Sequence, residues 1–346
     1  MLIKYFKALA RILIRFYYTI KKSGFVKLNN PKSEFIIWVP DFFSVRFFYD
    51  DNFQKVFSTY YYLRENCKVV TIYTRRDIGR FFDKKVIYFG SKNYNLFGFK
   101  NYMMQMAHIS EQLESQGNEV FPSTKEVVLW ENKDVMHSIF NEKDIRTPKT
   151  ELVDLETYIP AEFPFLIKEL NSCSSLGLYK IESKDDYDKA KHNLLSTKER
   201  KVLVQELLDI KSDLRVIYVG NEIILHYWRI NKASEWRPTS TGHGSEVDFV
   251  TFPSDWKDWM DNVVKNLDIR TGAFDITWEN DNLDGEPFVL EVSPFYQPNP
   301  PPGKSVKTSY GEWKKSVNIF PSGYQASFVR IVFDIQRKFV ETIIKQ

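Results

Sequence analysis

The sequence predicts an α/β protein with strands and helices mixed within each lobe, and with an amphipathic helix at its N-terminus. Three observations support this fold class. Basic residues recur at helical spacing over residues 2–22, short apolar strands alternate with helix-like stretches from Glu34 onward, and an acidic hairpin lies at residues 272–300. At 346 residues the chain is long enough for two or three domains and a sizeable core.

The net charge of +3 conceals an asymmetry between the N-terminus and the rest of the chain. Eight of the 48 basic residues lie in residues 1–33, which contain no acid, so the remainder carries 40 basic against 45 acidic residues. A general nucleic-acid binder needs a basic body, and we therefore expect no nucleic-acid partner. Cys67 and Cys173 form neither a zinc pattern nor a disulfide framework, which favours a reducing compartment and a cytoplasmic location.

Residues 2–22 are predicted to form an amphipathic helix. At about 3.6 residues per turn, five basic residues fall within about a quarter of its circumference, and apolar residues occupy the rest. A basic stripe with aromatic neighbours suits an anionic membrane surface, and would give the protein a peripheral contact with the inner face of a membrane. The alternative is that the helix packs its apolar side onto the body or onto a second subunit. The charges interrupt every turn, so we expect neither a membrane span nor a signal peptide. The five basic residues are Lys4, Lys7, Arg11, Arg15 and Lys22.

Residues 34–122 are predicted to form a small parallel sheet with helices on its faces, because short strands and helices alternate there. The segment after the first strand, VPDFFS, lacks the GxGxxG pattern, so we assign no dinucleotide to this domain. We expect the domain to position a substrate or to support its neighbour. The predicted strands are residues 35–39, 68–73 and 86–89, and the predicted helices are residues 53–65 and 96–116.

A second unit begins at about residue 123 and contains a run of small residues at 172–177 between two predicted strands. Backbone N–H groups in such a loop can reach phosphate oxygens, because no bulky side chain intervenes. Turns rich in Ser and Gly are common, so an ordinary connection is the alternative interpretation. We also expect a helix at residues 132–141 and a strand at 202–207.

The hairpin at residues 272–300 is predicted to place two carboxylates opposite each other. Strands at 273–278 and 287–293 flank a polar loop that ends in Asp284-Gly285, a strong turn signal. Side-chain alternation puts Glu291 on the same face as Val289 and Ser293, and the register brings it opposite Asp275, within a residue. Two facing carboxylates repel unless a cation lies between them, and Mg²⁺ prefers such ligands. The alternative is an edge hairpin with two surface acids.

Taken in order, the segments GNEVFPS, ENKDVMHSIF, DIRTPKT, FPFLIKEL, VLVQELLDIKSDLRVIYVG, GAFDITW and FVLEVSP resemble the ATP-grasp superfamily of ATP-dependent ligases. The resemblance covers about residues 117–293. It implies an ATP-grasp fold preceded by a small Rossmann-like β/α domain. The expected division of the chain is a basic helix at 1–33, the Rossmann-like domain at 34–122, the two ATP-grasp lobes at 123–204 and 205–300, and a C-terminal loop and helix at 301–346.

The resemblance also implies ATP and Mg²⁺ as cofactors and gives each site residue an expected role. Many relatives carry an asparagine where this chain has Ser293, so Asn299 or water is expected to complete the metal shell. The expected phosphate contacts are Lys133, Lys168, Ser174, Ser175 and Gly177; the adenine contacts are Glu206, Leu207 and Leu208; Asp213 matches the ribose position. The expected catalytic residues are Arg215 and Arg229, the metal ligands are Asp275, Glu291 and Ser293, and the substrate residues are Arg237, His243 and Asn299.

The function implied by the resemblance is ATP-dependent ligation of a carboxylate to an amine through an acyl phosphate. The expected partners are small-molecule carboxylate and amine substrates, in cell-surface glycan or related small-molecule biosynthesis. Two alternatives stay open: an ATP-grasp phosphotransferase, and a nucleotide-binding interaction module that has lost catalysis, for which Ser293 is the only sign. The sequence leaves the oligomeric state undetermined.

Overall fold

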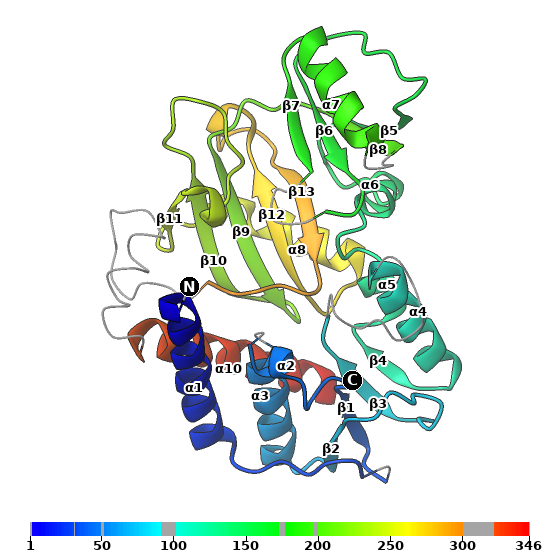
Figure 1. Ribbon diagram of the computed structural model, residues 1–346, viewed down its shortest axis with the longest axis vertical. Helices are drawn as coiled ribbons and strands as arrows, with labels where there is room; N and C mark the ends of the chain where they lie inside the picture. Colours follow the sequence, from blue (N-terminus) through cyan, green and yellow to red (C-terminus); the bar gives the residue numbers. More distant parts are fainter. Residues whose placement is uncertain are drawn as a thin grey trace.

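The structure is a computed structural model of the whole chain, and it describes residues 2–30, 32–49, 52–90, 102–172, 177–196, 200–299 and 322–345. Three sheets follow one another along the long axis of the molecule (Figure 1). A four-stranded parallel sheet lies at one end, a five-stranded sheet lies in the middle, and a four-stranded antiparallel sheet lies at the other end. This arrangement confirms the predicted α/β class with strands and helices mixed in each lobe.

The parallel sheet has the order β2-β1-β3-β4, and its strands are buried on both faces. Because side chains alternate along a strand, Phe35 and Ile37 face helices α3 and α10, whereas Ile36 and Trp38 face α4. The small parallel sheet expected in this part of the chain is therefore present; its description as Rossmann-like stays a prediction, as do the domain limits. Its elements are β1 (Phe35–Trp38), α2 (Val45–Tyr49), α3 (Asn52–Glu65), β2 (Val70–Tyr73), β3 (Lys85–Tyr88), α4 (Tyr102–Ser115) and β4 (Glu119–Phe121).

The antiparallel sheet has the order β5-β8-β6-β7 and carries helix α7 on its apolar face. A short helix, α5, and then α6 lead into it from the parallel sheet. The elements are α5 (Thr124–Val127), α6 (Lys133–Glu142), β5 (Thr150–Asp154), β6 (Phe165–Glu169), β7 (Leu178–Ile181), α7 (Lys184–Ser196) and β8 (Lys201–Glu206).

The five-stranded sheet has the order β11-β10-β9-β12-β13 and presents two chemically different faces. Leu214, Val216 and Phe274 pack against helix α8 on one face. Asp213 and Arg215, which alternate with them along β9, point to the other face. The elements are β9 (Ser212–Val219), β10 (Glu222–Ile230), β11 (Glu246–Asp248), α8 (Lys257–Leu267), β12 (Thr271–Thr277) and β13 (Phe288–Ser293), with short 3₁₀ turns at Thr241–His243, Ser254–Trp256 and Glu279–Asp281.

The two terminal helices, α1 (Leu2–Ser23) and α10 (Ser322–Ile344), come together beside α3 (Figure 1). Helix α1 confirms the predicted N-terminal helix, and it packs on the body with only part of its apolar side, through Ile20 and Phe16. Arg15 and Thr19 are buried against the body, while Leu13 and Tyr17 are exposed. The reason is that Arg15 finds a buried partner on α10, where its Nε donates to Gln325 Oε1 at 2.5 Å. Within the described residues, no helix has the length and apolar character needed to cross a membrane.

A buried ion pair joins the parallel sheet to the five-stranded sheet. Glu126 of α5 is 1% exposed and accepts hydrogen bonds from the backbone N–H of Arg270 at 2.7 Å and from its guanidinium at 2.5 Å. The Arg270 guanidinium also lies 4.3 Å from the centre of the Phe121 ring. Burial alone would raise the pKa of Glu126, but its bonds with Arg270 outweigh burial and hold that pKa below its usual value.

We predict that Arg270→Met lowers the free energy of unfolding by roughly 3–5 kcal/mol, because it leaves the Glu126 carboxylate buried and unpaired. The full difference in the free energy of unfolding between wild type and variant is expected above the ordinary glutamate pKa. The difference should shrink as the pH falls through the lowered pKa of Glu126 in the wild type, because Glu126 is then protonated in both proteins. Urea unfolding at several pH values measures both effects. The control is Lys125→Met, whose ion pair with Asp268 is exposed and should contribute little. Equal losses in the two variants would contradict the prediction.

Candidate functional site

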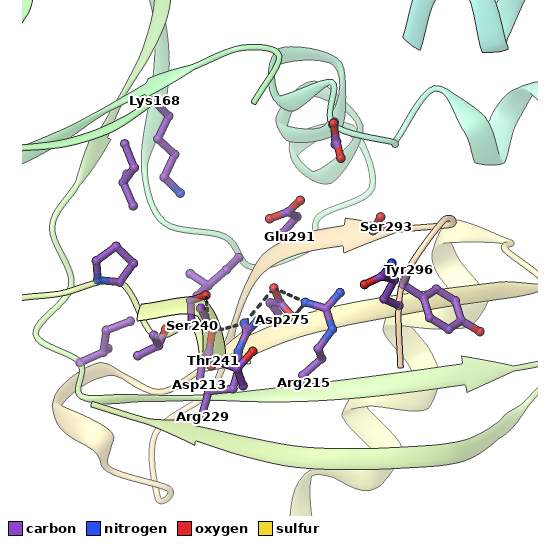
Figure 2. Close-up of a pocket in the computed structure, with 18 of the residues that line it drawn as sticks. Lys168, Asp213, Arg215, Arg229, Ser240, Thr241, Asp275, Glu291, Ser293 and Tyr296 are labelled. Carbon is purple, nitrogen blue, oxygen red and sulfur yellow. Dashed lines mark hydrogen bonds and ion pairs between the residues drawn. The ribbon is translucent and has the colours of Figure 1, made fainter. Parts of the chain in front are cut away.

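A cavity of about 770 Å³ lies between the antiparallel and five-stranded sheets, and the parallel sheet closes one of its ends. Lys168 of β6 points into it from one side, while Arg215, Asp275 and Glu291 rise from the five-stranded sheet on the other (Figure 2). The connection after β8 lines the cavity between these two groups. Most of the residues named from the sequence therefore meet in one place, although they span more than a hundred positions of the chain.

Asp275 on β12 pairs directly with Glu291 on β13, as the hairpin pattern predicts. The prediction for Val289 is wrong, because Val289 packs in the apolar core against α8 while Glu291 lines the cavity. The register shifts after this pair, so that Ile276 lies opposite Val289 and Leu290 is left over as a bulge. The bulge lets strand β13 keep Val289 and Val292 in the core while both Leu290 and Glu291 face the cavity.

Two arginines hold the Asp275 carboxylate. The Arg215 Nη1 donates to both of its oxygens, at 3.1 and 3.2 Å, and the Arg229 Nη2 lies 2.9 Å from Oδ2. Arg229 also binds Asp213 through two hydrogen bonds, of which the Nε bond is 2.7 Å long. These four side chains project from three neighbouring strands and form a chain of alternating charge, shown by the dashed lines in Figure 2.

Burial acts on both carboxylates of the facing pair, but their neighbours push them in opposite directions. Burial would raise the pKa of Asp275, yet Arg215 and Arg229 hold it below its usual value. For Glu291, burial and the nearby Asp275 charge together raise the pKa. Among the described residues, no hydrogen bond or ion pair reaches the Glu291 carboxylate. The site therefore contains a half-buried acid with a raised pKa and, among the described residues, no ion-pair partner.

Lys168 faces Glu291 across the cavity (Figure 2). Burial and the charge of Lys133 lower its pKa to about 8, against the opposing effect of Glu291. Lys133, at the start of α6, donates its Nζ to the backbone oxygen of Ser172 and, at 3.0 Å, to the Ser172 Oγ. It is not among the residues that line the cavity, although its charge acts on both Lys168 and Glu291.

The small-residue loop is described only in part. Cys173 and Leu176 lie outside the described residues, as do Ser174 and Ser175, which were expected to contact phosphate. Gly177 has a φ of +65°, and a Cβ there would lie 2.5 Å from the Glu169 side chain. Its carbonyl accepts the Glu169 N–H at 2.8 Å. A glycine is needed at 177 because the backbone must turn tightly at the start of β7.

The segment expected to contact adenine, Glu206 to Leu208, leaves β8 along the wall of the cavity. Glu206 is fixed by Lys149, whose backbone N–H donates to the Glu206 Oε1 at 2.7 Å. Asp213, the expected ribose contact, lines the same cavity but has its carboxylate occupied by Arg229. The ribose contact stays a prediction, and the geometry gives Asp213 a second role, which is to orient Arg229.

Ser293 lines the cavity near Asp275, and its Oγ donates to the Phe295 backbone oxygen at 2.7 Å. Of the three expected substrate residues, Arg237 and Asn299 line the cavity, and the Asn299 amide donates to the Tyr227 hydroxyl at 3.0 Å. His243 does not. It is exposed on a 3₁₀ turn whose neighbours, Thr241 and Gly242, reach the cavity instead.

Sequence reasoning missed the residues that the parallel-sheet unit contributes, namely Asn52, Lys55 and Gly90. Lys55 of α3 donates its Nζ to the Tyr296 backbone oxygen at 2.7 Å, where the segment after β13 crosses the end of the cavity. Nothing in the sequence indicated this, because Lys55 occupies an ordinary position of an amphipathic helix more than 200 residues away from its partner.

Within the described part of the chain, no group of three or more His, Cys, Asp or Glu side chains could hold a metal ion. The facing carboxylates nevertheless fit Mg²⁺, which needs only one or two protein carboxylates when phosphate oxygens and water supply its remaining ligands. Glu291 in particular is half-buried and, among the described residues, forms no ion pair, which favours this interpretation.

Comparison with known proteins bears on the family and the fold. Residues 130–292 match the family model described as a RimK-like ATP-grasp domain. No curated protein matches the sequence. Among solved structures, D-alanine–D-alanine ligase from Bacillus anthracis is 11% identical with a TM-score of 0.52, over 88% of this chain and 98% of that chain. The ATP-grasp ligase PsnB, solved with a minimal precursor, Mg and ADP, is 16% identical with a TM-score of 0.52, over 84% and 99%.

A RimK domain ATP-grasp protein from Sphaerobacter thermophilus DSM 20745 is 13% identical with a TM-score of 0.51, over 86% of this chain and 99% of that chain. At these identities the solved structures show a shared fold. Together with the family-model match, which spans the antiparallel sheet and most of the five-stranded sheet, they show an ATP-grasp fold and support the assignment of this chain to the ATP-grasp superfamily.

Proposed function

We propose that this chain is an ATP-dependent ligase that joins a carboxylate to an amine through an acyl phosphate, with ATP and Mg²⁺ as its cofactors. The observation that carries the proposal is the facing pair Asp275 and Glu291 in a cavity that also receives Lys168. Acids and bases with shifted pKa values in one cavity are typical of functional sites, and this set suits a polyanion with its metal.

Asp275 and Glu291 would hold Mg²⁺, which supplies positive charge to the phosphate oxygens when bound. Asp275 would then bind the metal and the two arginines together. Its carboxylate already fixes the positions of Arg215 and Arg229. The Ser293 hydroxyl donates its proton to the Phe295 backbone oxygen. The lone pairs of its Oγ therefore stay available, and Ser293 would serve as a third, uncharged ligand of the metal. Asn299 or water would complete the shell.

Lys168, Arg215 and Arg229 would neutralise the charge that develops during phosphoryl transfer. The substrate carboxylate attacks the γ-phosphorus, the bond to the ADP oxygen breaks, and an acyl phosphate forms. The amine then attacks the acyl carbon, inorganic phosphate leaves, and the amine loses a proton to give the amide. The protein contributes position and charge, so it needs no nucleophilic side chain of its own.

Adenine would lie against Glu206, Leu207 and Leu208, and the triphosphate would run toward Lys168, with Lys133, Ser174, Ser175 and Gly177 covering it. The end of the cavity beyond Arg215 would then receive the substrates, where Lys55 adds positive charge beside Tyr296. We therefore expect an acidic substrate at that end, and a substrate contact of Arg237 stays a prediction of the sequence. A cell-surface glycan precursor, a cytoplasmic location and a role for His243 in substrate binding stay predictions of the sequence.

The test is to incubate the protein with ATP, Mg²⁺ and panels of carboxylates and amines, and to measure ADP, phosphate and product mass. D-amino acids and peptides belong in the panels, because the solved relatives include a D-alanine–D-alanine ligase and a ligase in complex with a minimal precursor. We expect equal amounts of ADP and phosphate together with a condensed product. Phosphate retained on one substrate would instead identify a phosphotransferase, and ATP binding without turnover in every panel would favour a binding module.

We predict that Glu291→Gln lowers turnover at least about a hundredfold and weakens Mg²⁺-dependent ADP binding, because the amide removes one charged ligand from the metal. Isothermal titration of ADP with and without Mg²⁺ measures the binding independently of turnover. Glu279→Gln is the matched control, since it makes the same change in the same hairpin at an exposed position. Wild-type turnover in Glu291→Gln would remove Glu291 from the metal site.

We also predict that ATP affinity falls as the pH rises above about 8, where the free protein loses the Lys168 charge. Below that pH Lys168 is protonated and its charge attracts the phosphates, so ATP affinity should not depend on Lys168 titration there. Above that pH, ATP affinity should fall by up to about tenfold per pH unit. Lys168→Arg keeps its charge at every pH tested and should flatten the profile. Equilibrium binding of a fluorescent ATP analogue between pH 6 and 10 provides the measurement, and parallel profiles in the two proteins would contradict this role.

A further inference from the structure

Helix α1 presents its apolar side to solvent. Leu9, Leu13, Phe16 and Tyr17 are 53%, 57%, 41% and 57% exposed, and their spacing places them on one side of the helix. Arg15, Thr19 and Ser23, which lie further round the helix, are buried, and Ile20 packs against the core. An amphipathic helix that packs on a protein core normally shows the reverse arrangement, so this orientation requires an explanation.

The inward side of α1 is held by specific contacts. The Arg15 guanidinium lies 3.9 Å from the centre of the Phe328 ring, and its Nε donates to the Gln325 side chain. At the edge of this side the Nζ of Lys22, whose side chain is otherwise exposed, lies 4.5 Å from the centre of the Phe333 ring, also on α10. These cation–π contacts and the buried hydrogen bond fix the rotation of the helix about its axis. The outward direction of the apolar side is therefore a property of the fold.

Neighbouring residues extend the exposed apolar area. The Phe16 ring stacks on Phe53 at 5.5 Å and lies 6.3 Å from Phe48, which connects α1 with the segment around α2. In that segment Phe43 and Val45 are 75% and 81% exposed. We call Leu9, Leu13, Phe16, Tyr17, Phe43 and Val45 the apolar face. Clusters of exposed large apolar side chains of this kind usually mark a surface that is covered in the working protein.

The charge around the apolar face indicates what covers it. Residues 1–33 contain eight basic residues and no acid, and the four that follow Tyr17, namely Lys21, Lys22, Lys27 and Lys32, are exposed. A second copy of the chain on the same face would bring two such basic segments together. An anionic lipid surface would attract them, and the apolar side chains would enter the boundary between headgroups and acyl chains.

We propose that the apolar face binds an anionic lipid bilayer, with α1 lying in the plane of its surface. The basic residues flank the inserted side chains, as Lys21 does with its Nζ 5.6 Å from the centre of the Tyr17 ring. This differs from the sequence-based hypothesis, in which the basic stripe itself made the contact, because Arg15 of that stripe is buried. The inference does not depend on the proposed ligase reaction.

The test is co-sedimentation of the full-length protein with vesicles of phosphatidylcholine alone, or mixed in equal parts with phosphatidylglycerol. We expect binding to the anionic vesicles that salt weakens, and a partition coefficient at least about tenfold lower in the double variant Leu13→Glu, Tyr17→Glu. The double variant Leu152→Glu, Ile159→Glu makes the same charge change at exposed apolar positions of the antiparallel-sheet lobe, and should bind within about twofold of wild type. Thermal unfolding of each variant checks that it is folded.

A second measurement does not depend on the glutamate variants. An environment-sensitive fluorophore on Leu13→Cys, in a background with Cys67→Ser and Cys173→Ser, should shift its emission to the blue when anionic vesicles are added, while one on Leu152→Cys should not. Absence of binding by the wild-type protein, or an unshifted emission at position 13, would overturn the proposal. So would a dimer in sedimentation velocity that the Leu13→Glu, Tyr17→Glu variant disrupts, since the apolar face would then belong to a second copy.

Discussion

The structure of the site depends on how buried negative charge is compensated. Asp213, Asp275 and Glu291 project into one cavity, yet only two guanidinium groups, from Arg215 and Arg229, form ion pairs with them among the described residues. Both arginines are committed to Asp213 and Asp275. Glu291 is thereby left with a raised pKa, and a cation that arrives with its own polyanion would complete the compensation.

This arrangement rests on strand alternation and on one irregularity. Along β9 and β12 the residues that face the cavity alternate with residues of the α8 core, so Asp213, Arg215 and Asp275 share a face without any loop to position them. Strand β13 could not follow the same rule, because Val289 must be buried and Glu291 must not. The bulge at Leu290 resolves the conflict, because it turns Glu291 toward the cavity and keeps it opposite Asp275.

The sequence predicted the parts of the site that short-range patterns determine. The hairpin turn and the two flanking strands were enough to place Asp275 opposite Glu291, and the ordered motifs were enough to indicate the ATP-grasp fold. The bulge was not predictable, because strict alternation was assumed. The ion pairs of Asp213 and the cavity position of Lys55 were not predictable either, since each depends on a partner that only the tertiary fold brings within reach.

Helix α1 shows the same limit more sharply. Periodicity correctly gave a helix with a basic side and an apolar side, but it carries no information on which side meets the body. That choice depends on α10, whose Gln325 and Phe328 lie about three hundred residues further along the chain and offer Arg15 a hydrogen bond and an aromatic face. Burying an arginine with such partners costs less free energy than burying an unpaired one, and the side chains across the helix from Arg15 then face outward. The apolar face is thus the consequence of a polar contact.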